Sequence, residues 1–476
     1  DEVEDAAISV PDSGDHEEGG KMKMIVQLVR KCLGVKDIAS MRLSLPASLM
    51  EPIPNLEYWH YLDRPDLFAA INDSDDAFER MLAVLRFTFS KDLKFVHGRI
   101  CKPYNSVLGE HFRAHWDVDP AGLPPCSKVD STRSETVSVH SGASSSTRAS
   151  TSSCTGTPKS LSTAATSPQL SELHFSGQPV LRVVFLTEQV SHHPPISNYY
   201  AACPERGVEM YGTDQISARV AGTSVRIQPG QHNQGIYVRL ASGPGSGEEY
   251  RITHPAAYVN GLLRGSFYAT MCESTIITCS GGQVGAKYRA IIEYKEESWL
   301  GRAHFLLEGV IHVSHPSDPE WAKVKAVPRD RVVAEFNGSW RGKIRWRAAD
   351  FSPHGYEEYQ ELIDLEALSI VPKTVRSLEA QEPYESRKLW EGVTNHLLNK
   401  EYSDATREKV AIEQHQRDLA AERKRKGTQF LPRYFDADFS SGYALLTDKG
   451  CRVVEEELRL DRPVTKKNAR VAATAA

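Results

Sequence analysis

The feature that most restricts the fold is a long succession of short β-strand patterns between Leu181 and about Arg347. Runs such as LRVVFL, ISARVAG, TIITC and HFLLEGVIHV alternate with turns rich in Gly, Pro, Asn and Asp, as in strands joined by tight connections. No helix of crossover length intervenes, so we expect mostly antiparallel strands. About ten such strands favour a closed barrel or a heavily curled sheet. A barrel of that size can enclose a ligand cavity.

Other patterns in the sequence predict turns and helices around these strands. Asn337-Gly338, between VVAEF and GKIRW, predicts a hairpin turn. Apolar residues spaced by three and four predict a buried helix over 76–90. Two further helices are predicted over 387–398 and 405–426, the second ending in RKRK and Gly427. We expect 430–460 to form a short extended cap.

One segment has a composition that cannot form a core. Residues 131–170 contain 21 Ser or Thr among 40 residues and no aromatic residue, so they bury too little apolar surface to offset their ordering entropy. We interpret 118–176 as a disordered Ser/Thr-rich insertion that splits one domain. The apolar run Leu181–Leu186 should therefore pair with structure that precedes the insertion.

The N-terminal region divides into an acidic tail and an amphipathic segment. Residues 1–20 hold eight acidic residues and no Lys or Arg, which predicts a solvated, disordered tail. In the following KMKMIVQLVRKCLG, helical spacing places Met24, Ile25, Leu28 and Cys32 on one face, opposite basic residues. Such a helix can pack on a core, cover a pocket or lie on a membrane surface. The Pro-rich stretch that follows it, from Leu45 onward, predicts an extended apolar connector.

The segment EQVSHHPP, 188–195, is the most unusual short motif. Proline cannot continue a central strand and keeps the residue before it extended, so His192 and His193 should sit on a stiff exit from a strand. Adjacent residues on extended chain point to opposite sides, which disfavours chelation of one metal ion. The two imidazoles could donate hydrogen bonds to an oxyanion, or could be ordinary loop histidines.

Two further segments carry groups that can bind an anion. KPYNSVLGEHF, 102–112, offers the Lys102 ammonium and the Asn105 amide, although any loop between packed elements could look like this. Lys409, Glu413 and Arg417 are spaced by four and should share one stripe of a helix. That triplet could equally be a solvated ladder of salt bridges.

Together the three segments resemble the oxysterol-binding protein and oxysterol-binding-protein-related lipid transfer family. EQVSHHPP is similar to the family fingerprint, KPYNSVLGEHF resembles its KP-x-N-P-x-LGE stretch, and the K-x-x-x-E-x-x-x-R spacing resembles its C-terminal basic motif. The resemblance runs from about Met24 to Asp461. From it we expect a lid and connector over 21–54 and a lipid-binding domain over 55–461 interrupted by the insertion, followed by a disordered tail over 462–476.

The resemblance implies a fold, ligands and binding residues. The implied fold is mainly β with α: a large curled antiparallel β-barrel around a lipid tunnel, with an N-terminal helical lid and C-terminal helices. Phosphatidylinositol 4-phosphate is the shared ligand, exchanged for a sterol or phosphatidylserine, and membrane surfaces are transient partners. The implied lid residues are Met24, Ile25, Leu28 and Leu45. The residues implied to hold the lipid head group are Lys102, Asn105, His192, His193, Lys409, Glu413 and Arg417.

Several classes of function are disfavoured by the sequence. The net charge of −5 and pI near 6.4 do not indicate a nucleic-acid binder, and widely spaced cysteines predict no metal site. The absence of G-x-S-x-G and H-E-x-x-H motifs argues against a hydrolase. We therefore expect a non-enzymatic lipid exchanger without cofactor, with a lipid sensor as the alternative. We expect it in the cytoplasm and peripherally on membranes, at endoplasmic reticulum contact sites, the Golgi or the plasma membrane.

Overall fold

The structure is a computed structural model, and its contacts divide the chain into two units, Asp1–Ala121 with Val180–Ala476, and Gly122–Pro179. All described residues belong to the first unit. Residues 122–176 of the predicted insertion, the predicted C-terminal tail, and Met24, Ile25, Leu28 and Leu45 of the predicted lid lie outside them. Val118 is the last residue of a paired strand, so the predicted start of the insertion at 118 is too early. The described residues are 8–9, 27, 30–32, 34–35, 37–38, 43–44, 50–97, 102–121, 180–261, 267–297, 303–349 and 358–460.

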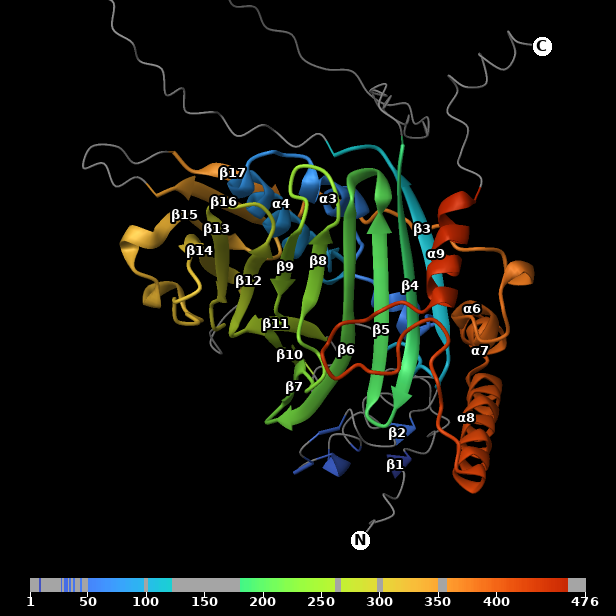
Figure 1. Ribbon diagram of the computed structural model, residues 1–476. Coiled ribbons are helices and arrows are strands. Elements are labelled where there is room, and N and C mark those ends of the chain that lie inside the picture. Colours follow the sequence, from blue (N-terminus) through green and yellow to red (C-terminus); the bar gives the residue numbers. More distant parts are fainter. Residues whose placement is uncertain are drawn as a thin grey trace, which may run out of the picture. The chain divides into compact units, whose positions relative to one another are not determined.

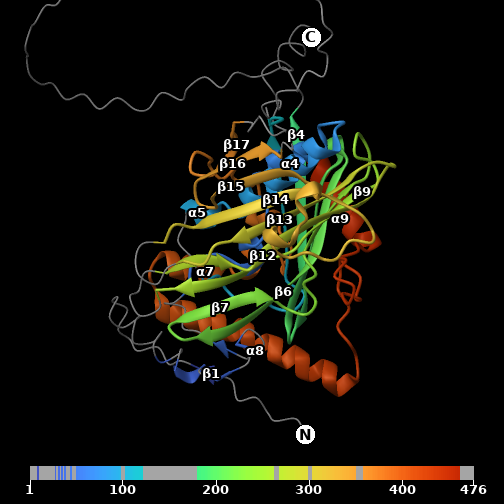
Figure 2. The same cartoon turned by 90° about the vertical axis from the view of Figure 1, so that its left-hand side faces the viewer.

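A sheet of 15 strands, antiparallel at every pairing, forms the body of the first unit (Figure 1). The order runs β11-β10-β7-β6-β8-β9-β12-β13-β14-β15-β16-β17, and β5, β4 and β3 continue from β6. Among the described residues no pairing joins β3, β11 and β17 to close a ring. Figures 1 and 2 show that strand direction turns strongly from β4 to β15, so the heavily curled sheet is the form found. The bounds are β3 His111–Val118, β4 Leu181–His192, β5 Pro195–Cys203, β6 Val208–Ala221, β7 Ser224–Pro229, β8 Ile236–Leu240, β9 Glu248–Ile252, β10 Ala256–Asn260, β11 Tyr268–Cys272, β12 Ser274–Gly281, β13 Lys287–Tyr294, β14 Leu306–Ser314, β15 Val332–Ser339, β16 Lys343–Ala348 and β17 Gln360–Asp364.

The strands on either side of the Ser/Thr-rich segment are direct partners. β3 pairs with β4 along its whole length, from His111 opposite Glu188 to Val118 opposite Leu181. This confirms that the apolar run Leu181–Leu186 pairs with structure before the segment. β4 is buried at its first ten positions, as expected for a strand covered on both faces.

The predicted hairpin between VVAEF and GKIRW forms, but its turn lies elsewhere. Asn337 and Gly338 remain in β15, paired with Arg345 and Ile344, so the prediction of a turn at Asn337-Gly338 is wrong. The chain reverses after Ser339, where the Gly342 N–H donates to the Ser339 carbonyl at 3.0 Å. The longer ladder brings Trp340 against Phe305, with ring centroids 5.3 Å apart, and this burial favours extension over the earlier turn.

The helix predicted over 76–90 is α4, Ala77–Ser90, and it supplies much of the core. Asp76 caps it by accepting from the N–H groups of Phe78 and Glu79. Eleven of its fourteen residues are buried, as for a helix enclosed by other elements. The neighbouring helices are α2 Asn55–Tyr58, α3 Pro65–Ala69 and α5 Lys94–His97.

The described C-terminal region contains four α-helices, two more than predicted. The predicted helix over 387–398 is two, α6 Ser386–Leu389 and α7 Glu391–Leu398, separated by Trp390. α8, Tyr402–Lys426, ends at the left-handed Gly427 as predicted. α9, Asp448–Arg459, corrects the prediction of an extended cap over 430–460. Thr447 caps α9, and Val453, Val454 and Glu457 are buried on one face of it. Because most other residues of this helix are charged, the sequence shows too few apolar positions to predict it.

Short elements complete the described part of the chain. β1 Ile8–Ser9 pairs in parallel with β2 Leu43–Ser44, and Ile8 and Ser9 fall within the range predicted to be a disordered tail. No described helix combines the length and apolar character that crossing a bilayer requires. The 3₁₀ helices are η2 Ala70–Asn72, η3 Pro204–Arg206, η4 Val324–Ala326, η5 Arg329–Arg331 and η6 Leu378–Ala380.

Candidate head-group site

The two adjacent histidines lie at the tight turn between β4 and β5. His192 ends β4, His193 and Pro194 form the turn, and Pro195 begins β5. The imidazole ring centroids are 4.4 Å apart, and both side chains are exposed. The predicted stiff exit from a strand is therefore found, as a turn within a hairpin of paired strands.

Glu188 and Gln189, which begin the same motif, fix β4 to its surroundings. The buried Glu188 carboxylate accepts hydrogen bonds from the backbone N–H groups of Arg433 and Tyr434, at 2.7 and 2.8 Å. Burial raises the pKa of Glu188, against the effect of these donors. Gln189 exchanges backbone hydrogen bonds with Gly109 and Glu110. The motif therefore joins the 102–112 loop to the segment after α8.

The 102–112 loop is held by its own glutamate. Glu110 is fully buried and accepts from the Val107 N–H, the Trp390 indole N–H and the Ser386 hydroxyl. Burial raises its pKa to about 7, although the three donors act in the opposite direction. Gly109 has φ +82°, and a Cβ there would lie 3.3 Å from the Phe430 ring. A positive φ favours glycine, and Gly109 therefore suits the turn that the loop makes at this position.

A pocket of about 290 Å³ lies where these segments meet α8. Leu108 comes from the loop, the two histidines come from the turn, and Gln416, Ala420 and Arg423 come from α8. Among the described residues that line the pocket there are two imidazoles and one guanidinium but no carboxylate. These groups can donate hydrogen bonds to an anion, and none of them repels it. The lining residues are Leu108, Val190, Ser191, His192, His193, Gln416, Ala420, Arg423 and Phe430.

The structure brings together only part of the predicted residue set. Lys102 and Asn105 are exposed on the loop, and the Lys102 ammonium donates to the Asn105 side-chain oxygen at 2.6 Å. Lys409 is buried, and its ammonium lies 2.6 Å from the Glu413 carboxylate. None of these four residues lines the pocket, so of the seven predicted residues only the two histidines do so.

Arg417 does not share the inward stripe of α8, which corrects the prediction for that triplet. It is exposed, and its Nε donates to the Gln414 side-chain oxygen at 3.0 Å. Eight residues rotate the helix by about 80° beyond two full turns, whereas steps of seven stay close to one line. The inward positions are accordingly Lys409, Gln416 and Arg423.

Gln416, Arg423 and Phe430 are pocket residues that the sequence analysis missed. Gln416 donates to the Tyr384 hydroxyl at 3.3 Å, and the Arg423 guanidinium lies 6.0 Å from the centre of the Phe430 ring. The signal available in the sequence was the interval of seven from Lys409 to Gln416 and Arg423. Phe430 follows the end of the helix and left no comparable signal.

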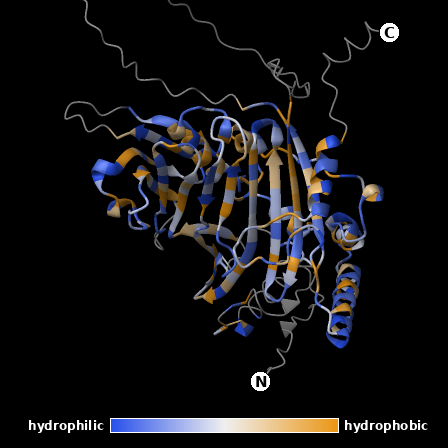
Figure 3. Cartoon of the chain, in the orientation of Figure 1, coloured by the Kyte–Doolittle hydropathy of each residue, from blue (hydrophilic) through white to orange (hydrophobic). Residues whose placement is uncertain are grey.

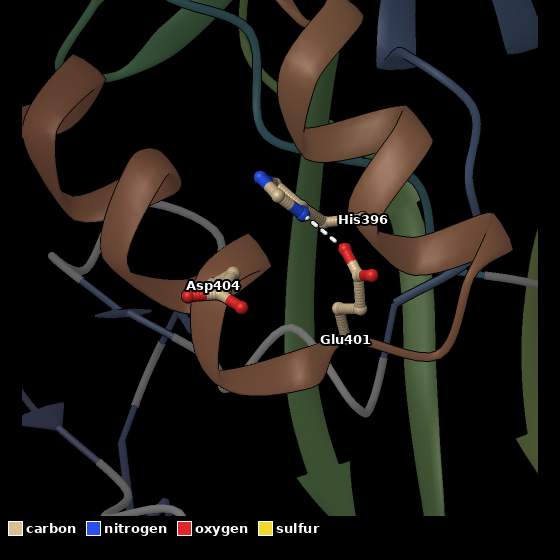
Figure 4. A group of neighbouring side chains, drawn as sticks. All are labelled: His396, Glu401 and Asp404. Atoms are coloured by element: carbon tan, nitrogen blue, oxygen red, sulfur yellow. Dashed lines mark hydrogen bonds and ion pairs between the residues drawn. The ribbon is translucent and has the colours of Figure 1, made fainter.

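A second polar cluster lies at the junction of α7 and α8 (Figure 4). The His396 Nδ1 lies 2.6 Å from the Glu401 carboxylate, and Asp404 is close enough to both to share an ion. Asp404 also pairs with Arg407 at 2.7 Å. Each of the three groups already has a close partner of opposite or potentially opposite charge, and none of them lines the pocket.

Parts of the predicted lid contact the sheet and the loop. The Ile38 N–H donates to the Ala218 carbonyl on β6, and the Asp37 carboxylate accepts from the Ala218 N–H. Further on, the Glu51 N–H donates to the Lys102 carbonyl at 3.0 Å. The segment around 37–38 is therefore attached to β6, and residues 50–54 to the 102–112 loop.

Comparison with known proteins matches the Oxysterol-binding protein family model to residues 24–449. Oxysterol-binding protein-like protein 1 of Schizosaccharomyces pombe is 40% identical, and the alignment covers 96% of each chain. Human Oxysterol-binding protein-related protein 11 is 29% identical over 83% of this chain, which spans only 45% of that relative.

Solved structures show the same fold at low sequence identity. The Osh1 ORD domain, in complex with cholesterol, aligns over 92% of this chain and 90% of its own, with a TM-score of 0.57 and 17% identity. The Osh3 ORD of Saccharomyces cerevisiae, in complex with PI(4)P, covers 96% of this chain and 97% of its own, with a TM-score of 0.56 and 16% identity.

Proposed function

This chain belongs to the oxysterol-binding protein family, and from that premise we propose that it binds phosphatidylinositol 4-phosphate and exchanges it between membranes for a second lipid. The family is one of lipid binders that are not enzymes, in agreement with the prediction. The proposed second lipid is a sterol or phosphatidylserine. The proposed ligand is the one present in the Osh3 complex.

The observation that carries the proposal is the cationic pocket beside the β4–β5 turn. A phosphate monoester bears close to two negative charges and three strong acceptor oxygens. His192, His193 and Arg423 present donors to one small volume without a carboxylate among its described lining. Charge-assisted hydrogen bonds from such groups are about twice as strong as neutral ones, so a phosphorylated head group is the ligand that fits best.

The other predicted residues are proposed to act from the borders of the pocket. Lys102 and Asn105 lie on the loop that supplies Leu108, where an ammonium and an amide can reach ring hydroxyls or phosphate. Glu413 holds the Lys409 ammonium and can orient it toward the head group. Arg417, on the exposed side of α8, would contribute mainly to long-range attraction.

The acyl chains are proposed to enter the interior of the curled sheet, under a lid formed by residues 21–54. An acyl chain contributes about 0.8 kcal/mol per buried CH₂, so a carrier needs an apolar interior and a cover that opens on the membrane. The attachment of residues 37–38 to β6 and of 50–54 to the 102–112 loop supports a cover hinged near the pocket. Cys32, on the predicted apolar stripe, is buried.

The experiment that tests the proposal is vesicle-to-vesicle transfer of three labelled lipids in parallel: phosphatidylinositol 4-phosphate, a sterol and phosphatidylserine. The proposal predicts transfer of the phosphoinositide and of one of the other two, with no release of inorganic phosphate. Transfer should be sought between membranes of endoplasmic reticulum composition and membranes of Golgi or plasma-membrane composition, the proposed sites of action. A folded protein that transfers no phosphoinositide would contradict it.

A further inference from the structure

The C-terminal end of α8 carries a concentrated positive charge. Arg423, Lys424, Arg425 and Lys426 are consecutive, and the last three are exposed. Figure 3 shows α8 as hydrophilic along most of its length. We call these four residues with Leu431 the basic end. The chain as a whole has a net charge of −5, so this cluster is a local feature.

The charge of the basic end is only partly balanced by its neighbours. Lys426 lies 2.6 Å from the Glu422 carboxylate. Within the described part of the chain, no carboxylate pairs with Lys424 or Arg425. Leu431, five residues beyond the end of the helix, is 73% exposed. An exposed leucine beside unbalanced basic residues is the combination found where proteins contact membrane surfaces.

The basic end is continuous with the mouth of the candidate head-group site. Arg423 belongs to both, and Phe430, next to Leu431, lines the same pocket. Figure 1 shows the far end of α8 and the β4–β5 turn at the same end of the sheet. A flat anionic surface that contacts Lys424, Arg425 and Leu431 would therefore present its head groups beside His192 and His193.

We propose that the basic end docks this protein onto anionic bilayer surfaces and places the pocket against the lipid head groups. The inference rests on the proposed function for its biological purpose, although docking itself needs no phosphoinositide. A bilayer is favoured over a nucleic acid because Leu431 adds an apolar contact that phosphodiester backbones do not use. The electrostatic part should weaken with salt, because exposed charges are screened beyond about 8 Å at physiological ionic strength.

The test compares two matched triple variants of the full chain. One is Lys424→Gln, Arg425→Gln, Lys426→Gln, which spares the pocket residue Arg423. The control is Lys323→Gln, Lys325→Gln, Arg329→Gln, which removes three exposed charges between β14 and β15. Co-sedimentation uses vesicles of phosphatidylcholine with phosphatidylglycerol as the sole anionic lipid, so that neither proposed cargo is present. Circular dichroism and melting temperature establish that both variants fold.

The proposal predicts that the basic-end variant loses about 100-fold in partitioning to these vesicles at low salt, about fivefold per charge, while the control keeps its binding. Leu431→Ser should reduce the binding that remains at high salt. Short-chain phosphatidylinositol 4-phosphate, added without vesicles, should bind the basic-end variant as it binds the wild type. If it binds neither protein while docking follows this pattern, the proposed function fails and the docking surface stands.

Two results would overturn the docking proposal. One is equal loss of vesicle binding in the folded control and the basic-end variant, which would indicate a non-specific charge effect. The other is vesicle binding that the basic-end variant retains in full, with duplex DNA binding lost instead. In that case the basic end would bind nucleic acid.

Discussion

Glu110 of the 102–112 loop and Glu188 of the EQVSHHPP segment are structural residues. Each is fully buried and accepts hydrogen bonds from donors on distant segments: Glu110 from Trp390 and Ser386, and Glu188 from the N–H groups of Arg433 and Tyr434. A buried acceptor left without its partners costs more than the bond itself contributes. These acids therefore hold the loop and the turn in place.

The Glu110 carboxyl should make stability depend on pH. Its pKa is raised from 4.5 to about 7 in the folded protein, chiefly by burial, so the folded state holds a proton that the unfolded chain releases. The contribution of this carboxyl to the free energy of unfolding should be largest below pH 4.5 and should be lost as the pH rises through about 7. In the protonated form, the proton on Glu110 Oε1 can be donated to the Ser386 hydroxyl. That hydroxyl can in turn donate to the His111 carbonyl.

Glu110→Gln keeps the shape of the side chain and replaces the carboxyl by an amide, which can donate a hydrogen bond but does not titrate. In urea unfolding, the stability of this variant should therefore fall less between pH 5 and pH 8 than the stability of the wild type. Glu110→Ala should lower the free energy of unfolding at both pH values by about 2–4 kcal/mol, because it leaves buried donors unpaired. An identical pH slope in wild type and Glu110→Gln would show that Glu110 does not titrate in this range.

His192 and His193 are exposed, so their replacement should not disturb the core. The double variant His192→Ala, His193→Ala should reduce phosphatidylinositol 4-phosphate extraction from vesicles by about 100-fold or more, from two charge-assisted hydrogen bonds. Its melting temperature should stay within a few degrees of the wild type. The matched control is His304→Ala with His315→Ala, two exposed histidines flanking β14. Undiminished extraction by the folded double variant would reject the head-group role.

Among the helices, α8 separates residues that the sequence motif groups together. Lys409 is buried against Glu413, and Arg417 faces solvent. Removing one partner of a buried ion pair costs about 3–5 kcal/mol, so Lys409→Glu confounds ligand binding with folding. Arg417 is exposed, so a change of its charge should alter the attraction for the lipid head group without affecting folding.

Arg417→Glu should therefore lower phosphatidylinositol 4-phosphate affinity severalfold, with a salt dependence and little change in melting temperature. Transfer of the second lipid should change much less. Arg407→Glu, on the first turns of the same helix and paired with Asp404, is the control and should leave affinity unchanged. Equal weakening of both cargoes by Arg417→Glu would mean that α8 has a structural role only.

The predicted lid should be removable only as far as the residues that belong to the core. Met50 is buried with Tyr104 and Trp390, and Glu51 and Ile53 bond to the 102–112 loop. A truncation of residues 1–44 should then leave a folded domain that extracts lipid poorly and adheres to vesicles, because the interior stays uncovered. If residues 21–44 are instead fixed packing, the truncated protein should unfold, and amide exchange in the intact chain should show them as protected as β4.

At the scale of the whole molecule, period-two patterns were sufficient to predict the antiparallel sheet, because side chains alternate between two faces along every strand. The same signal could not place the β15–β16 turn, since burial of Trp340 outweighs the local preference of Asn337-Gly338. α9 was missed because charged residues dominate it and only three side chains are buried.

The sequence was sufficient to predict some residues of the candidate site but not all of them. The histidine pair and the loop were evident as motifs, whereas Gln416, Arg423 and Phe430 enter the pocket only through the docking of α8 against the turn. The interval of seven that places Gln416 and Arg423 on one face of α8 is visible in the sequence, but it does not show which element that face contacts. The pairing of β4 with structure before residues 122–179 was foreseeable, because the apolar run Leu181–Leu186 follows a segment whose composition cannot form a core.

If the proposed exchange takes place, the interior of the sheet holds phosphatidylinositol 4-phosphate or the second lipid, and never both. The decisive measurement is native mass spectrometry of the protein loaded with phosphatidylinositol 4-phosphate and then mixed with vesicles that contain a sterol or phosphatidylserine. We expect one lipid per protein throughout, with the phosphoinositide mass replaced one for one by the mass of a single second cargo. A complex that carries both lipids together, or a folded protein that never carries the phosphoinositide, would contradict it.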